Sequence, residues 1–494
     1  MDYSVLKSGT DIRGVASDIF NNKVNLTDEA VKDITKAFVV WYVNKFSKSY
    51  NEMVMAVGHD SRITGPEISQ KVVEALSESG VKVIDCGLSS TPAMFMTTVD
   101  LKTDAAIEIT ASHHPADRNG LKFFLPTGGL NASDISEIIE LANSREEVIS
   151  SSKGEIEIIN YMELYAARLR KMICDAVGKT EAEKPLKEYK IVVDAGNGVG
   201  GFYAKEVLEK LGADIKGSRF LEPDGMFPNH IPNPENETAM ESICEAVVSS
   251  NADLGLIFDT DVDRAGCVGP DGREINRNRL IALASYIATN GRKNAIVVTD
   301  SVTSDGLKKF IEEDLGCVHY RYRRGYKNVI NKAVELNEKG KDCPIAIETS
   351  GHAALKENYF LDDGAYLVTK IVIELARGKN INELIKNLEL PAEEKEIRFD
   401  INAENFKAYG EWVIKEFEEY FSSMKGYVIA SDNREGIRVS NENGWFLLRL
   451  SVHDPVMPMN FESRVEGGIK KEAELLIEFF SKFALLNIET LKNI

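Results

Sequence analysis

Short apolar runs that alternate with helical patterns constrain the fold of this chain more than any other feature of its sequence. The first run, Met53–Asp60, ends in polar residues, and a helix is predicted from Pro66 to a stop near Gly80. The same unit recurs over roughly the first three quarters of the chain, in the runs Val81–Gly87, Tyr189–Gly198, Ala252–Asp261, Asn294–Ser301 and Pro344–Gly351. Strands separated by helices of about 10–15 residues indicate βαβ units and mixed, mostly parallel sheets.

The pattern changes near Leu390. A charged connector is expected there, followed by the run EIRFDI (Glu396–Ile401) and a long helix over Glu404–Phe421. Short apolar runs joined by tight turns and a closing helix from about Val465 complete the pattern. Strands joined by short turns indicate an antiparallel α+β domain. Polar segments at Asn143–Glu157 and Asn290–Asn294 are candidate linkers. A chain of 494 residues exceeds what one core usually supports, so two to four domains are expected.

Composition excludes several classes of protein. The net charge of −19 repels phosphodiester backbones, so no nucleic-acid partner is expected, and any anionic substrate needs local cations. No run approaches the roughly 18 apolar residues that cross a membrane, and the N-terminal residues lack a signal-peptide pattern. The six cysteines are scattered without a CxxC pair. These features predict a soluble, cytoplasmic protein with reduced, buried cysteines.

Three aspartates follow one of the apolar runs. Asp259, Asp261 and Asp263 occupy alternate positions, and in an extended segment their side chains share a face. Carboxylates so placed repel one another unless a cation lies between them, and hard oxygen ligands suit Mg2+. Arg264 adds a donor of fixed geometry for phosphate. The segment is interpreted as a metal site, although it also matches the haloacid-dehalogenase-type phosphatases, in which Asp259 would be the nucleophile and Phe360–Gly364 the later acidic pair.

A serine lies in a second polar segment after an apolar run. Ser112 stands between Ala111 and two histidines, and no GxSxG motif of a hydrolase surrounds it. The alternative is a serine that carries phosphate, whose charge of about −1.5 to −2 would repel the three aspartates unless a metal bridged them. The two segments therefore explain each other as one site.

The serine segment also carries a family resemblance. TASHHP, at Thr110–Pro115, resembles the TASHNP phosphoserine loop of the α-D-phosphohexomutase family (phosphoglucomutase/phosphomannomutase). Further motifs similar to those of the family follow in its order: GTDIRG (Gly9–Gly14), NGLK (Asn119–Lys122), DTDVDR (Asp259–Arg264), RRGYK (Arg323–Lys327), ETSGH (Glu348–His352) and RLSVHDP (Arg449–Pro455). The resemblance implies three similar α/β domains at residues 1–155, 156–289 and 290–391, and an α+β domain with an antiparallel sheet at 392–494.

The resemblance also implies roles for individual residues. Ser112 would carry the phosphoryl group and, with the three aspartates, hold Mg2+. The remaining residues fall into three groups: Arg13 and Lys122 beside the transferring phosphate; Lys327 and His352 as candidates for proton handling; and Glu348, Ser350, Arg449, Ser451, His453 and Arg264 as substrate-binding residues.

Two positions depart from the family pattern. His114 replaces the usual Asn beside the phosphoserine, and its imidazole can still form hydrogen bonds. Val452, His453 and Asp454 stand where Gly or Asn, Thr and Glu are usual, so a threonine donor to phosphate is lost. His453 is the expected substitute donor, with more charge below its pKa near ~6.5. This change bears on the identity of the sugar more than on the class of reaction.

The sequence therefore predicts a phosphosugar mutase. Phospho-Ser112 would interconvert hexose 1-phosphate and hexose 6-phosphate, of glucose or mannose, through a hexose 1,6-bisphosphate that also serves as activator. The alternatives are a hexose-1,6-bisphosphate synthase on the same scaffold, the dehalogenase-type phosphatase, and a sugar-phosphate-binding regulator without turnover. The expected partners are a small phosphosugar and Mg2+, with no membrane, and the expected assembly is a monomer or homodimer.

Overall fold

The computed structural model describes residues 2–451 and 454–494, which form two compact units. The first unit comprises Met1–Ile287 and Ser350–Leu384, and the second comprises Ala288–Thr349 and Ile385–Ile494. The strands of each unit form two sheets, and the two units are described separately. Within the described residues, no helix is both long enough and apolar enough to span a membrane.

The first sheet of unit one has the strand order β1-β2-β6-β5-β3-β4-β8, with β7 paired to β6. Strands β3, β4, β5 and β8 are parallel, whereas β1, β2, β6 and β7 pair antiparallel. The strands are β1 (Lys7–Ser8), β2 (Asp11–Val15), β3 (Val54–His59), β4 (Lys82–Leu88), β5 (Ala105–Ile109), β6 (Arg118–Leu125), β7 (Gly128–Gly129) and β8 (Ile156–Ile158). Strand β8 lies beyond residue 155, yet it completes this sheet by pairing with β4.

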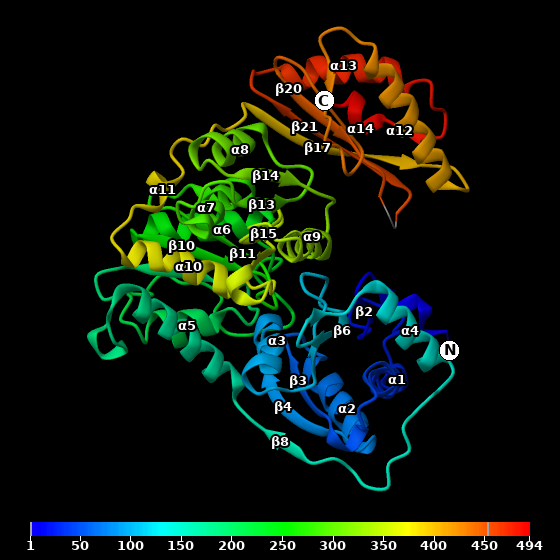
Figure 1. Ribbon diagram of the computed structural model, residues 1–494, viewed down its shortest axis with the longest axis vertical. Coiled ribbons are helices and arrows are strands. Elements are labelled where there is room, and N and C mark those ends of the chain that lie inside the picture. The colour runs from blue at the N-terminus through cyan, green and yellow to red at the C-terminus, as the bar shows by residue number, and fades with distance from the viewer. Residues whose placement is uncertain (1, 452–453) are drawn as a thin grey trace. The chain divides into compact units, whose positions relative to one another are not determined.

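Helices cover both faces of this sheet. Alternate strand residues such as Ile107 and Ile109 pack in one core with helices α1 (Asp28–Phe46), α2 (Gly65–Glu78) and α4 (Ala132–Asn143). Helix α3 (Thr91–Asp100) packs on the other face, where Phe95 meets Phe124 of β6, and Figure 1 shows it on the opposite side of β3 from α1. The carboxyl ends of β3 and β5 lie next to the N-terminus of α3.

The second sheet of unit one has the order β12-β11-β10-β9, with β9 and β10 parallel. The strands are β9 (Ile191–Asp194), β10 (Leu254–Phe258), β11 (Ala265–Val268) and β12 (Glu274–Ile275). The helices are α5 (Tyr161–Val177), α6 (Glu237–Ser250), α7 (Arg277–Thr289), α10 (Gly364–Ala376) and α11 (Ile381–Leu384); β16 (Ala353–Leu355) precedes α10. The glycine-rich turn after β9 packs closely against the backbone after β10: a Cβ on Gly198 would lie 2.7 Å from the Thr260 carbonyl oxygen.

Unit two begins with parallel strands in the order β14-β13-β15: β13 (Ile296–Thr299), β14 (Val318–Arg321) and β15 (Ile345–Ile347), with helices α8 (Asp305–Lys309) and α9 (Tyr326–Glu338). Its second sheet is antiparallel throughout, in the order β18-β19-β20-β21-β17-β22. These strands are β17 (Glu393–Ile401), β18 (Val428–Ile429), β19 (Ile437–Ser440), β20 (Gly444–Leu448), β21 (Val456–Ser463) and β22 (Leu486–Asn487).

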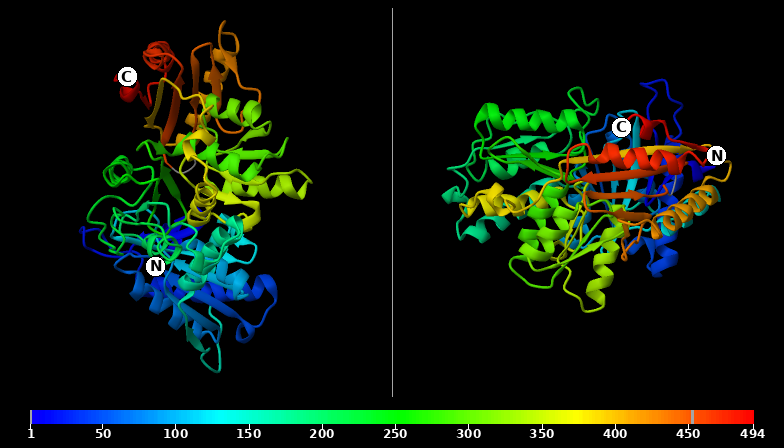
Figure 2. Two further views of the ribbon diagram at one scale, coloured as in Figure 1. Left: turned by 90° about the vertical axis from the view of Figure 1, so that its left-hand side faces the viewer. Right: turned by 90° about the horizontal axis from the view of Figure 1, so that it is seen from above.

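One aromatic core lies under the antiparallel sheet. Phe399, Phe446 and Phe461 point from the strands to Phe417 and Phe480 of helices α12 (Phe406–Ser422) and α13 (Gly468–Phe480), and α14 (Glu489–Lys492) closes the chain. Helix α13, in red, lies along this sheet in the two views of Figure 2. The predicted fold class is confirmed, with three α/β sheets and one antiparallel α+β domain. The charged connector predicted near residue 390 is wrong in one respect, because β17 begins at Glu393.

Candidate active site

Ser112 follows β5 at the carboxyl end of the first sheet. Its backbone has φ of +51°, a left-handed conformation that is uncommon for a residue other than glycine. The side-chain oxygen donates a hydrogen bond to Asp259 Oδ2 at 3.2 Å and accepts one from Arg264 Nη2 at 3.1 Å. The buried hydroxyl therefore lies between a carboxylate and a guanidinium that come from the second sheet.

Arg62 holds the loop around Ser112, and sequence reasoning missed it. This fully buried guanidinium donates through Nη1 to the carbonyls of Pro115 and Arg118, both at 2.8 Å, and through Nη2 to those of Ser112 and His114. Asp60 accepts from the Arg62 backbone amide at 2.9 Å and lies 3.4 Å from its Nε. The available signal was the position of both residues directly after β3, at the edge where parallel sheets bind ligands.

The three aspartates follow β10, and their carboxylate oxygens lie within 4.8 Å of one another. They meet through a turn rather than through the extended segment that their spacing predicted. Val262, between the last two, has φ of +66°, which is a genuine outlier for a β-branched residue. Gly364 at the start of α10 supports this turn, because its amide donates to the Val262 carbonyl at 3.1 Å.

Two basic side chains neutralise part of the acidic cluster. Lys122 Nζ donates to Asp261 Oδ2 at 3.0 Å and to Asp263 Oδ2 at 2.6 Å. The Arg264 guanidinium lies 2.9 Å from Asp259 Oδ2. Burial opposes ionisation of Asp263, but Lys122, His352 and Arg264 outweigh it and hold its pKa below the usual range. Burial and the neighbouring Asp263 raise the pKa of Asp259 well above its usual range.

The donor set fits a divalent cation. The cluster brings three carboxyl groups together beside the side chains of Lys122 and Arg264. Oxygen Oδ1 of Asp261 and of Asp263 is buried and accepts no hydrogen bond within the described part of the chain. Hard carboxylate oxygens with free lone pairs suit Mg2+, which is bound by few carboxylates together with phosphate oxygens. The Ser112 hydroxyl beside Asp259 is where such a phosphate would stand.

The N-terminus of α3 also contacts the acidic cluster. The backbone amide of Thr91 donates to the Asp261 carbonyl at 2.9 Å, and its hydroxyl donates to Asp261 Oδ2 at 2.5 Å. The acidic cluster after β10 therefore contacts the α3 helix that packs on the first sheet.

His352 reaches the same site from the segment before α10. Asp263, His352 and Asp362 place ligand atoms within 4.8 Å of one another, and His352 Nδ1 pairs with Asp362. Burial disfavours the imidazolium, but Asp362 and Asp263 outweigh it and raise the pKa of His352 to about 9. Asp362 was not predicted as a site residue. Its neighbour Asp363 is structural, since it caps α10 and accepts from Tyr165 at 2.6 Å.

Arg13 lies on β2, where its Nη2 donates to Asp11 at 2.9 Å. Burial lowers the pKa of His113 to about 2, and the nearby Arg264, His114 and Arg13 act in the same direction. Arg13 therefore belongs to the electropositive surroundings of the Ser112 loop. Ser350 begins the second segment of the same unit, and its buried hydroxyl has no hydrogen-bond partner among the described residues.

The remaining predicted residues belong to unit two. Glu348 Oε1 accepts from the Gly325 amide at 2.6 Å, and Lys327 lies in the first turn of α9. Arg449 follows β20, donates to Asn460 at 3.1 Å, and lies 3.6 Å from Glu396 and 3.8 Å from Glu435. Ser451 Oγ accepts from the Asp454 amide at 3.2 Å. The predicted phosphate donor His453 lies outside the described residues.

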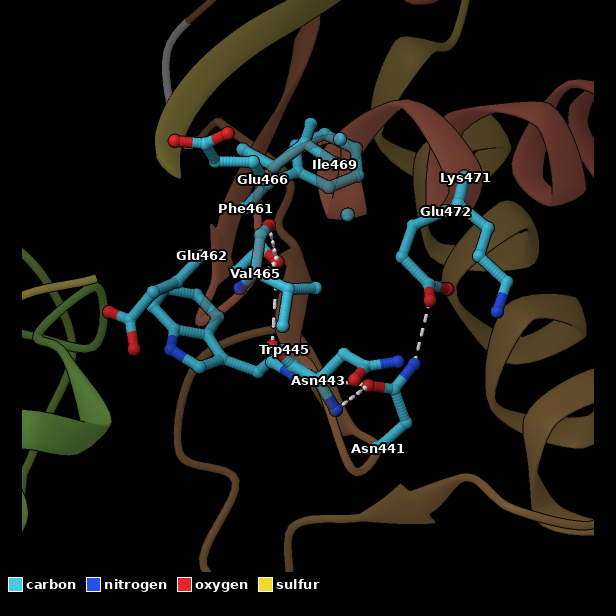
Figure 3. A pocket seen from close by; sticks show the side chains of 14 residues that line it. Asn441, Asn443, Trp445, Phe461, Glu462, Val465, Glu466, Ile469, Lys471 and Glu472 are labelled. Atoms are coloured by element: carbon cyan, nitrogen blue, oxygen red, sulfur yellow. Dashed lines mark hydrogen bonds between the residues drawn. The ribbon is translucent and has the colours of Figure 1, made fainter. Parts of the chain in front are cut away.

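A separate cavity of about 150 Å³ lies in the C-terminal domain, between β20, β21 and the start of α13 (Figure 3). Two hydrogen bonds join residues that line it: Glu472 accepts from Asn441 Nδ2 at 2.7 Å, and Asn441 Oδ1 accepts from the Asn443 amide at 2.8 Å. None of the predicted site residues lines it.

The fold and the site define a phosphoryl-transfer enzyme, with a serine hydroxyl, three carboxylates and several cationic side chains at the carboxyl edges of adjoining α/β sheets. The family models of phosphoglucomutase/phosphomannomutase, alpha/beta/alpha domains I, II and III, match residues 6–148, 163–272 and 276–390. The chain belongs to the phosphoglucomutase/phosphomannomutase family.

Individual relatives agree with this assignment over most of their length. The chain is 28% identical over 469 residues to a phosphoglucomutase of Neisseria gonorrhoeae, with 93% of each chain covered. It is 29% identical over 463 residues to a phosphomannomutase/phosphoglucomutase of Pseudomonas syringae pv. tomato, with 93% of this chain and 92% of the relative covered. The crystal structure of a phosphoglucomutase/phosphomannomutase family protein from Burkholderia thailandensis has the same fold, with a TM-score of 0.79, 24% identity, and 98% and 100% coverage.

The dehalogenase-type alternative is set aside by this membership. The site supports the same conclusion, because Asp259 is paired with Arg264 and Ser112, while Asp362 and Asp363 have the separate roles described above. Asp259 is therefore a partner of the serine, and no feature of the site marks it as a nucleophile.

Proposed function

We propose that this enzyme interconverts the 1-phosphate and 6-phosphate of a hexose, glucose or mannose, with phospho-Ser112 as the phosphoryl donor. The observation that carries the proposal is the position of Ser112 Oγ between Asp259 and Arg264, beside a carboxylate cluster whose donor set fits Mg2+. The Arg264 guanidinium beside this hydroxyl would stabilise the negative charge of the phosphoryl group during its transfer.

The proposed reaction has two transfers. A free sugar hydroxyl attacks the phosphorus of phospho-Ser112, and the P–O bond to Oγ breaks. The hydroxyl proton passes to the neutral form of His352 or Lys327; for His352 this is the minor form below its raised pKa of about 9. The resulting hexose 1,6-bisphosphate turns over within the site and returns its other phosphoryl group to Ser112. Mg2+ held by the three aspartates would offset charge on the transferring phosphoryl group.

The proposed contacts to the sugar come from the other predicted residues. Glu348 and Ser350 would accept or share hydrogen bonds with adjacent hydroxyls, since a carboxylate can accept from two O–H donors. Arg449 and Ser451 would bind the phosphate that is not transferred, with the planar guanidinium as a two-donor fork. Arg13 and Lys122 would lie beside the transferring phosphate. These assignments extend the family resemblance to the positions at which the chain carries the same residue types.

The test is a coupled assay of the purified full chain with glucose, mannose, glucosamine and N-acetylglucosamine 1-phosphates, Mg2+ and a trace of hexose 1,6-bisphosphate. We expect turnover of the glucose or mannose compounds, and we expect Ser112→Ala to abolish it. Ser133→Ala, at an exposed serine on α4, is the control. Turnover by Ser112→Ala at the rate of the natural chain would refute the proposal. In a parallel assay with fructose 1,6-bisphosphate supplied in excess as phosphoryl donor, release of free hexose 1,6-bisphosphate as the main product would instead identify a bisphosphate synthase.

The compartment and the assembly complete the proposal. All six cysteines are unpaired, and five are buried, as is usual in a reducing compartment. We place the enzyme in the cytoplasm as a monomer or homodimer. Size-exclusion chromatography with light scattering would measure the assembly directly.

A further inference from the structure

Glu108 is a buried glutamate beside the site to which no role has been given. It lies in β5 between Ile107 and Ile109, which face the core formed with α1, α2 and α4. Because successive side chains of a strand point to opposite faces, Glu108 points to the face that α3 covers. The residue is 0% exposed, and neither carboxyl oxygen has a hydrogen-bond partner among the described residues.

The strand register places Lys122 next to this glutamate. Glu108 pairs directly with Lys122 of β6 in the antiparallel ladder, and with Gly58 of β3 in the parallel one. Directly opposed residues share a face, with Cβ atoms about 4.5–5.5 Å apart. Burial and the nearby Asp60 and Asp261 raise the pKa of Glu108 well above its usual range, and Lys122 acts in the opposite direction.

A buried carboxyl group without a partner is costly, and folded chains retain few of them. Here the nearest ammonium group is held by two other carboxylates, Asp261 and Asp263, at 3.0 and 2.6 Å. An apolar side chain at position 108 would match the buried surroundings better. The glutamate is therefore unexplained by the packing of this face, and its position opposite Lys122 is the feature that distinguishes it.

A divalent cation changes the balance between these groups. Asp261 and Asp263, which bind Lys122, are two of the three carboxylates that would bind the cation. The Lys122 ammonium group and the cation therefore compete for the same oxygens. The ammonium and the cation also repel each other at short range in a buried site. Lys122 would then need another acceptor within reach of its side chain, and Glu108 is the buried carboxylate that the register sets beside it.

We propose that Glu108 is the second partner of Lys122, which holds the ammonium group in the site when the three aspartates take a divalent cation. Glu108 is thus a positioning residue that acts through Lys122 and makes cation binding compatible with a retained lysine. The inference deepens the proposed function, since it rests on the proposed cation site. It concerns a residue that neither the motif pattern nor the acidic cluster includes.

The test measures Mg2+ binding to the purified full chain by isothermal titration calorimetry, for the natural chain, Glu108→Gln, Lys122→Met and the double variant. We expect Glu108→Gln to weaken Mg2+ binding about tenfold or more, because Lys122 then keeps its hold on the aspartates. In the Lys122→Met background the same change should have little effect. Glu462→Gln, at a buried glutamate of unit two, is the matched control and should leave Mg2+ affinity unchanged.

A second readout separates this role from a structural one. Without Mg2+, Glu108→Met should raise the melting temperature, because it removes a buried polar group that has no partner among the described residues. A residue needed for the fold would lower it. The proposal is overturned if Glu108→Gln leaves Mg2+ affinity unchanged, if the loss is as large in the Lys122→Met background, or if Glu108→Met lowers the melting temperature.

The outcomes also distinguish this inference from the proposed function. A natural chain that binds no Mg2+ refutes the cation site and the role of Glu108 together. If the natural chain binds Mg2+ and turns over substrate, and Glu108→Gln binds Mg2+ with the same affinity, then only the role of Glu108 is refuted.

Discussion

The guanidinium of Arg62 provides the sharpest test of how the serine loop is held. Arg62→Lys keeps the positive charge beside buried Asp60 but replaces four donors in a planar fork by three donors on one nitrogen. At least one of the four loop carbonyls must then lose its hydrogen bond. A hydrogen bond to a charged group contributes about 1.5–3 kcal/mol, so opening of the loop should become about 10 to 150 times more frequent at about 1.4 kcal/mol for each factor of ten.

The assay is amide hydrogen exchange over residues 110–118 in the natural chain and in Arg62→Lys. Two amides report directly on the loop, those of His114 and Arg118, which donate to the Ala111 and Pro115 carbonyls at 3.1 and 3.0 Å. Arg168→Lys is the matched control, because Arg168 has a partly exposed pair with Asp100 at 3.2 Å, and such pairs contribute little. Unchanged exchange over this loop in Arg62→Lys would refute the reasoning, whatever the activity.

Two further predictions follow from the site and its supports. Asp263→Asn should weaken Mg2+ binding at least about tenfold, since even residues that only support ligands affect affinity by that amount; calorimetry measures it, and unchanged affinity would remove Asp263 from the cation site. His230, whose Nε2 lies 3.0 Å from Asp194, has a raised pKa, because the carboxylate outweighs the effect of burial. A raised folded-state pKa stabilises the fold fully below the unfolded value near ~6.5, and this contribution is lost as pH rises. The excess unfolding free energy of the natural chain over His230→Gln should therefore be larger at pH 5.5 than at pH 8, and the opposite order in urea titrations would contradict the assignment.

Much of the local structure is predictable because it depends on neighbours in the chain. The strand at Met53–Asp60 and the helix that follows Pro66 are found almost at their predicted ends, as β3 and α2. The aspartates after β10 were predicted to meet, and they do, but the geometry was wrong. Their turn depends on Val262 in a left-handed conformation, which no local propensity favours and which contacts from Gly364 support.

Residues that act by contact across the fold were the ones missed. Arg62 and the serine loop lie about fifty positions apart, and Asp362 was first considered as part of an acidic pair in another class of enzyme. Thr91, the first residue of α3 on the first sheet, donates a hydrogen bond to Asp261, which follows β10 of the second sheet. No periodicity or spacing within one segment carries such information, because each bond joins elements that only folding brings together.

The sequence by itself determined the alternation of strands and helices, the antiparallel C-terminal domain, and the identity of Ser112 and the three aspartates as a linked site. These follow from apolar periodicity and from the chemistry of side chains placed directly after strands. Only the tertiary structure decided which cationic side chain contacts which acceptor. Lys122 donates to Asp261 and Asp263, and Arg264 binds Asp259 and the Ser112 hydroxyl. Arg62 donates to the carbonyls of the serine loop. The tertiary structure also decided that Glu108 is buried opposite Lys122 without a partner among the described residues, because strand register and burial are set by the packed sheet.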